Sequence, residues 1–304
     1  MAGGSDARKV AAEYFRQMCE SGEREVYLPP ENARAVRGDA RPQERFAAAG
    51  RGAPKKADAK PAGGKAPAAR TATTTKAAAT PTGPGRPATE APDVEVIRVK
   101  LAFSHDSTTG DMFAAGSGLE KCATLEDVEA AMSGCTKCEL ADGRTNIVFG
   151  AGDPNARLLF VGEAPGRDED IQGVPYVGRA GQLLNKILDA AEIAREDVYI
   201  ANIIKCRPPN NRTPLTNEIE ACIPYLGRQV ALIAPKIICT LGLPATQTLL
   251  GIRGSMGSLR GKMYVDGDVK VIPTYHPAAA LRDPKYKRPI WDDFLLIKRE
   301  YQRQ

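Results

Sequence analysis

Runs of apolar residues recur along the last two thirds of the chain and alternate with helical patterns. Four runs have the length and composition of buried strands: 158–161, 198–206, 236–242 and 270–276. The first run stops at Gly162 and opens into a loop rich in acids, glycines and prolines, and a helical pattern begins at Gly178. Strands alternating with helices predict an α/β fold with three layers, α/β/α, around a central, mostly parallel four-stranded sheet.

Helices are predicted where apolar positions recur three and four residues apart. Thr124 is the expected N-cap of one helix, with Asp127 three residues later, and Pro235 is expected to end another. Residues 94–103 alternate like a strand that has no evident partner. The predicted helices cover 125–135, 216–234, 244–251 and the segment from about Pro289 to the C-terminus.

The first third of the chain has a different composition. Residues 28–92 are rich in Ala, Pro, Gly, Thr and Lys and hold almost no bulky apolar side chains. Such a segment cannot bury enough surface to offset the entropy of an ordered chain, so we expect disorder there. A short helix is expected over 7–21. The pattern therefore divides the chain into a largely disordered extension, 1–118, and a folded domain, 119–304.

Charge is unevenly distributed along the chain. The formal net charge of the 304 residues is +5, and residues 51–88 hold eight Lys or Arg but one acid, Asp58. A basic segment attached to a near-neutral domain suits a polyanionic partner. The start, MAGGSDARKV, lacks the apolar core of a signal peptide, and no run approaches the ~20 apolar residues of a membrane span. We therefore expect a cytoplasmic protein with reduced thiols and no membrane partner.

Four of the seven cysteines have a suggestive arrangement. Cys135 and Cys138 form a C-x-x-C motif, Cys206 ends a predicted strand, and Cys222 lies in the next predicted helix. Zinc sites usually add a second close pair or histidines, and a redox dithiol usually sits at a strand-to-helix turn. Four thiolates from scattered elements also suit a [4Fe–4S] cluster. Spacing alone leaves a cluster, zinc or no metal open. The remaining cysteines, Cys19, Cys122 and Cys239, are expected to be bystanders.

Several longer motifs occur in a recognisable order. GEAPGRDEDIQGVPYVGRAGQLL, NIIKCRPPNNR and TYHPAAAL, together with the four cysteines, resemble the family 4 uracil-DNA glycosylases, iron–sulfur members of the uracil-DNA glycosylase superfamily. The resemblance covers about residues 119–304. It implies a hydrolase that flips uracil out of DNA and hydrolyses the N-glycosidic bond, leaving an abasic site for base excision repair. It also implies a [4Fe–4S] cluster on the four cysteines and uracil-containing DNA as the partner. We expect a monomer.

The resemblance assigns residues to base binding. Gly162 and Ala164 belong to the first motif, and Tyr176 stands where the family usually has a Phe that stacks on the flipped uracil. Asn202 matches the residue that reads the base edge. An amide offers both a donor and an acceptor, so Asn202 can bond uracil O4 and N3–H together. Cytosine mismatches both bonds, and sites that hydrogen-bond their substrate reject such analogues strongly.

The resemblance also assigns residues to catalysis. His276 matches the histidine of the last motif and can donate to uracil O2 as negative charge develops there. Glu163 or Glu169 can position water and stabilise the positively charged sugar, and the sequence does not choose between them. The alternative function is a non-catalytic iron–sulfur DNA-binding or polymerase-associated module. Candidate phosphate contacts are Arg207, Asn210, Asn211, Arg212, Lys285, Lys287 and Arg288.

Deleting residues 1–92 is expected to leave the chemistry of the domain intact, because this segment has little apolar surface to bury. The deletion should weaken nonspecific DNA binding and flatten its salt dependence, since fewer basic residues then release counterions. DNA binding measured at several salt concentrations checks this. Loss of single-turnover cleavage at saturating DNA would show instead that the extension is part of the site.

Overall fold

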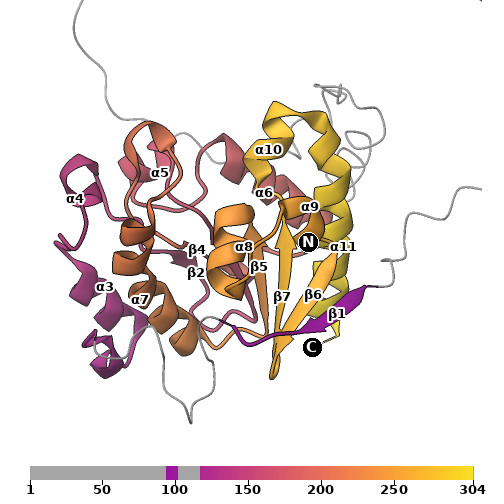
Figure 1. Ribbon diagram of the computed structural model, residues 1–304, viewed down its shortest axis with the longest axis horizontal. Helices are drawn as coiled ribbons and strands as arrows, with labels where there is room; N and C mark the ends of the chain where they lie inside the picture. Colours follow the sequence, from indigo (N-terminus) through magenta and orange to yellow (C-terminus); the bar gives the residue numbers. More distant parts are fainter. Residues whose placement is uncertain (1–93, 102–116, 304) are drawn as a thin grey trace, which may run out of the picture. The chain divides into compact units, whose positions relative to one another are not determined.

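Seven strands form one mixed sheet in the computed structural model, which describes residues 94–101 and 117–303 (Figure 1). Their order across the sheet is β1-β6-β7-β5-β3-β4-β2. The strands are β1 (Glu95–Arg98), β2 (Ala151–Gly152), β3 (Leu158–Gly162), β4 (Tyr199–Asn202), β5 (Ile237–Leu241), β6 (Lys262–Asp266) and β7 (Val269–Thr274). Strands β3, β4, β5 and β7 run parallel, whereas β2 is antiparallel to β4 and β6 is antiparallel to β7.

The mostly parallel sheet is confirmed, but the prediction of four strands was wrong. The four predicted strands form the parallel centre of the sheet, where β3, β4 and β5 are buried along their whole length. The additional strands lie outside this centre and carry exposed or half-buried positions, as in β1 and β6. Continuous apolar runs mark strands covered on both faces, so the outer strands give a weaker signal. Strand β1 pairs parallel with β6 and therefore draws part of the segment assigned to the extension into the sheet.

Along the chain, most of the helices lie between strands. They are α3 (Leu125–Met132), α4 (Leu140–Gly143), α5 (Arg167–Gln172), α6 (Arg179–Ala190), α7 (Thr216–Ile233), α8 (Leu243–Leu250), α9 (Met256–Leu259), α10 (Pro277–Arg282) and α11 (Lys287–Gln302). Short 3-10 helices cover Leu119–Lys121, Arg195–Asp197, Pro209–Asn211 and Pro284–Tyr286. The helix predicted over 7–21 lies outside the described residues.

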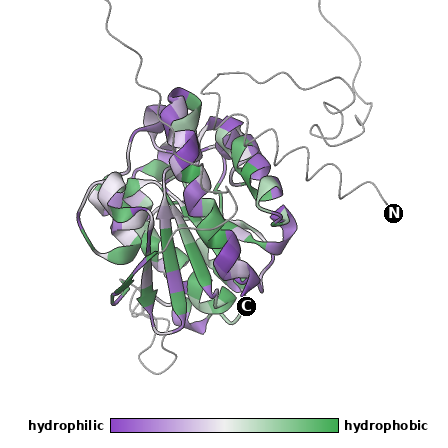
Figure 2. Ribbon diagram, turned by 90° about the vertical axis from the view of Figure 1, so that its right-hand side faces the viewer, coloured by the Kyte–Doolittle hydropathy of each residue, from purple (hydrophilic) through white to green (hydrophobic). Residues whose placement is uncertain are grey.

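Helices cover both faces of the sheet, which confirms the three layers. On one face α6, α10 and α11 pack against Phe160 and Cys239, and on the other α7, α8 and α9 pack against Leu159 and Ile238. Figure 2 shows the apolar strands at the centre of the fold, with polar positions on the outer surfaces of the helices. A third, smaller cluster joins α3 to α7 through Val128, Met132 and Tyr225.

Local signals predicted several helix ends. The Thr124 side chain accepts from the Asp127 N–H and the Asp127 carboxylate accepts from the Thr124 N–H, a reciprocal capping box that begins α3. Helix α7 ends at Ile233, and its C-cap Ala234 adopts a left-handed φ of 50° just before Pro235. The acidic loop after β3 instead contains the short helix α5. None of the helices within the described ranges is both long and apolar enough to cross a bilayer.

Candidate active site

The candidate site lies at the carboxyl ends of parallel strands. Gly162 ends β3 and Asn202 ends β4, and the register of this parallel pair sets the two residues opposite each other. His276 follows the end of β7 by two residues and caps α10. Open α/β sheets bind ligands at this edge because the loops after parallel strands converge there.

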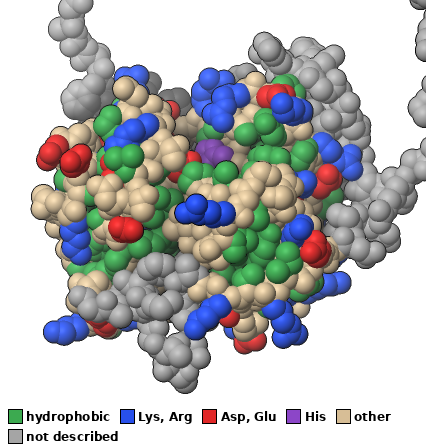
Figure 3. All heavy atoms as spheres, in the orientation of Figure 1, with side chains coloured by type: hydrophobic (Ala, Val, Ile, Leu, Met, Phe, Trp, Pro, Cys, Tyr) green, Lys and Arg blue, Asp and Glu red, His purple; other side chains and the backbone are tan. Residues whose placement is uncertain are grey.

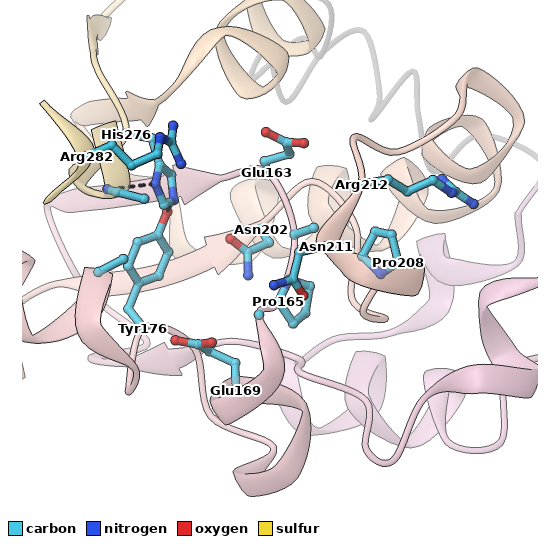
Figure 4. Close-up of a pocket in the computed structure, with 14 residues that line it drawn as sticks. Glu163, Pro165, Glu169, Tyr176, Asn202, Pro208, Asn211, Arg212, His276 and Arg282 are labelled. Carbon is cyan, nitrogen blue, oxygen red and sulfur yellow. Dashed lines mark hydrogen bonds between the residues drawn. The ribbon is translucent and has the colours of Figure 1, made fainter. Parts of the chain in front are cut away.

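A pocket of about 340 Å³ opens at this edge. Figure 3 shows a histidine side chain in a hollow of this face, with basic side chains on the surface around it. Figure 4 shows the side chains of Tyr176 and His276 pointing toward each other on one side of the pocket. Glu163 and Asn202 lie on the other side of this pair. Six residues that the sequence assigned to base binding or catalysis line it: Glu163, Ala164, Glu169, Tyr176, Asn202 and His276. The other lining residues are Pro165, Gly166, Ala180, Pro208, Asn211, Arg212, Ala278 and Arg282.

Gly162 lies next to this pocket. Its missing side chain leaves space for the side chains of Tyr176 and Asn202. A Cβ at this position would stand 2.1 Å from Tyr176 Oη and 2.5 Å from Asn202 Oδ1. Both distances are far inside van der Waals contact, so any side chain here would displace the hydroxyl, the amide or both. The glycine of the first motif therefore sets how closely Tyr176 and Asn202 approach the end of β3.

Asn202 carries an unusual polar group. The residue is 1% exposed, and its Oδ1 has no hydrogen-bond partner within the described structure. A buried oxygen without a partner costs about 1–3 kcal/mol, so native structures rarely keep one without a reason. A ligand with an N–H group in the pocket would remove that cost.

His276 is neutral and has a defined tautomer. Its Nδ1 accepts from the Ala278 N–H at 3.1 Å, which requires the single proton of the neutral ring to be on Nε2. Nε2 lies 3.0 Å from Tyr176 Oη and donates to it. Burial, followed by the charge of Arg282, lowers the His276 pKa to about 4. At neutral pH the imidazole is therefore an uncharged donor that points into the pocket.

Tyr176 adopts a strained backbone that its surroundings hold in place. Its φ is 56°, a left-handed conformation that costs a bulky residue on the order of 1–3 kcal/mol. Glu169 Oε1 accepts from the N–H groups of Val177 at 3.0 Å and Gly178 at 2.9 Å, which fixes the turn just after the tyrosine. A Cβ on Gly181 would stand 1.8 Å from the Tyr176 carbonyl oxygen, so this glycine admits the close approach of α6.

The two candidate carboxylates differ in their surroundings. Glu169 is engaged by the backbone of the Tyr176 turn. Glu163 is half-buried, and burial raises its pKa above the usual glutamate value, against a smaller effect of the Thr213 side chain. Glu163 is thus the carboxylate whose environment resembles that of a general base.

Sequence reasoning missed some pocket residues and misplaced others. Arg282 lines the pocket although no motif marked it; its position at the end of the helix that His276 begins was the available signal. Of the candidate phosphate contacts, Asn211 and Arg212 line the pocket, and Arg212 is ion-paired with Glu218. Lys287 is buried, which makes it a poor phosphate contact.

The two cysteines of the C-x-x-C motif, together with Cys206 and Cys222, line one small cavity that is separate from the pocket. Cys135 and Cys138 lie between α3 and α4, Cys206 follows β4, and Cys222 lies in α7. Burial raises the pKa of the Cys206 thiol and raises that of Cys222 to about 12, which disfavours thiolates that lack a cationic partner. Among the described residues, no three Cys, His, Asp or Glu side chains stand in an arrangement suited to a single metal ion.

Known proteins are similar to this chain in sequence. Residues 149–295 match the family model of the uracil DNA glycosylase superfamily. A type-4 uracil-DNA glycosylase of Sulfurisphaera tokodaii is 45% identical over 58% of this chain and 84% of its own length. The type-4 enzyme of Archaeoglobus fulgidus is 44% identical over 57% of this chain and 92% of its own length. That of Thermotoga maritima is 46% identical over 52% of this chain and 84% of its own length. The chain therefore belongs to the type-4 uracil-DNA glycosylases.

Replacing Gly162 with Ala is expected to destabilise the protein by about 1–3 kcal/mol, because the added methyl overlaps Tyr176 Oη and Asn202 Oδ1. Gly143→Ala is the matched control, since a Cβ there meets nothing within 4 Å. Denaturant unfolding of both variants tests the difference. Equal stability of the two would show that the pocket rearranges freely around Gly162.

Proposed function

We propose that this protein is a uracil-DNA glycosylase that hydrolyses the N-glycosidic bond of a uracil flipped out of DNA. Family membership supports this proposal, and the observation that carries it is the unpartnered, buried Oδ1 of Asn202 at the pocket. A base inside a duplex is out of reach, so the enzyme extrudes it into a pocket. The product is DNA with an abasic site, the first intermediate of base excision repair.

Asn202 reads the edge of the base. Its Oδ1 accepts the uracil N3–H, and its amide N–H donates to O4. Cytosine has no proton on N3 and carries a donor where uracil carries O4, so both bonds fail and the amide oxygen stays unpaired. The Tyr176 ring, 5% exposed at the pocket, supplies the stacking surface.

His276 and Glu163 act on the bond that breaks. As the bond to C1′ lengthens, the electron pair moves into the base and charge gathers on O2, where the His276 Nε2–H donates. A neutral donor suits this step because it stabilises the anion without needing to be protonated at neutral pH. Glu163 positions the water that adds to C1′ and stabilises the positive charge on the sugar.

The four cysteines fit a [4Fe–4S] cluster. Each thiolate of such a cluster binds a different iron, so the four sulfurs stand farther apart than around a single ion. Four thiols from separate elements line one cavity, which suits this donor set. When bound, the cluster ties the C-x-x-C segment, the loop after β4 and helix α7 together. Arg144 Nη1 lies 3.5 Å from Cys206 Sγ and adds positive charge beside the thiolates.

DNA is the macromolecular partner. Arg212 and Arg282 at the pocket and the basic residues of segment 51–88 supply charges that suit a phosphate backbone. We also propose that the enzyme is a monomer and is cytoplasmic, a compartment in which cysteines stay reduced. A non-catalytic iron–sulfur module would not need the unpartnered amide oxygen or the oriented imidazole, so the pocket favours the enzyme.

Replacing Asn202 with Asp is expected to slow base release at least about a hundredfold. An ionised Asp presents acceptors alone, so the donor to O4 is lost and its charge opposes the uracil anion. Single-turnover kinetics on a uracil oligonucleotide at saturating enzyme measures the chemical step.

Asn155→Asp is the matched control for charge, because this exposed residue precedes β3 at the opposite end of the strand. DNA affinity of both variants should change little, since phosphate contacts dominate it. Near-normal cleavage by a folded Asn202→Asp protein would remove Asn202 from the site.

The purified protein is expected to hold about four irons per chain. Cys206→Ala and Cys222→Ala should lose iron and stability together, because the cluster joins separate elements. Cys239→Ala, a buried cysteine in β5 away from the cavity, should keep its iron. Metal analysis with thermal unfolding decides this, and one zinc per chain in place of iron would exclude the cluster.

A further inference from the structure

The hydrogen-bond donor of His276 is already engaged in this structure. Because Nδ1 accepts the Ala278 N–H, the neutral ring has one proton to give, on Nε2, and it is donated to Tyr176 Oη at 3.0 Å. The rings are 5.6 Å apart between centroids and tilted by 35°. A base oxygen that needs this donor must therefore take the place of the tyrosine hydroxyl as its acceptor.

The backbone that carries the tyrosine ring is held in place. The turn of Tyr176 is fixed by Glu169 and by the close approach of Gly181, and Gly162 provides the space that Oη occupies. Burial keeps the phenol protonated by raising the Tyr176 pKa well above its usual value. The pocket thus contains a neutral oxygen acceptor beside the donor that acts on the base.

We propose that the Tyr176 hydroxyl is a built-in competitor of the base for the His276 Nε2–H, and that it favours release of free uracil. This inference rests on the proposed glycosylase function. In the transition state the base oxygen carries negative charge, and charge-assisted hydrogen bonds are about twice as strong as neutral ones, so the base wins the donor.

The balance reverses after the reaction. Water has added to C1′, and the proton it releases neutralises the uracil anion. Neutral uracil then competes with a neutral phenol on about equal terms, and the hydroxyl can take the donor back. Tyr176 therefore weakens binding of free uracil by the hydrogen bond that the base has to displace, and weaker product binding speeds turnover when product release is the slow step.

The test is Tyr176→Phe, which keeps the stacking ring and removes the competitor. Phe differs from Tyr by one hydroxyl and keeps the ring volume, so the variant is expected to fold. Inhibition by free uracil should become about three- to tenfold tighter, the range for one neutral hydrogen bond. Calorimetric binding of free uracil measures the same competition without turnover.

Tyr275→Phe is the matched control. It removes a hydroxyl from the residue next to His276, whose ring packs on Tyr286 and does not line the pocket. Its uracil inhibition should equal that of the original protein. Unchanged uracil binding in Tyr176→Phe would overturn the proposal, and weaker binding would overturn it by showing that the hydroxyl helps hold the base. Failure of the original protein to release uracil would instead refute the proposed function.

Discussion

The parallel pairing of β3 with β4 is the constraint on which the pocket depends. It sets Gly162 opposite Asn202, so the space left by the glycine and the buried amide lie side by side. A shift of one residue in this register would turn the Asn202 side chain to the other face of the sheet. Apolar packing on both faces prevents that shift, and so the core of the protein fixes the geometry of its polar site.

The central strands were predictable because they are buried on both faces and read as continuous apolar runs. Strand β1 was visible as an alternating segment, but its partner was not, since β6 lies far along the chain and is itself half-buried. Strand β2 has two residues and gives no periodic signal. The helix at α5 was hidden because its acidic residues resemble an exposed loop.

The identities of the pocket residues could be read from motifs, but their interactions could not. Tyr176 and His276 are one hundred positions apart, and no local pattern reports that a hydroxyl of one would engage the imidazole of the other. Glu163 and Glu169 look equivalent in sequence. They differ because the fold turns Glu169 toward two backbone N–H groups and leaves Glu163 at the pocket.

The order of the cysteines along the chain has a consequence for biosynthesis. Cys135 and Cys138 leave the ribosome well before Cys222, which lies in α7. The cavity that brings all four thiols together does not exist until that helix has been made and has packed against α3. At about 5–20 residues per second, the first pair waits several seconds for its partners. Assembly of the proposed cluster would therefore be a late event, because it requires all four thiols to be in place.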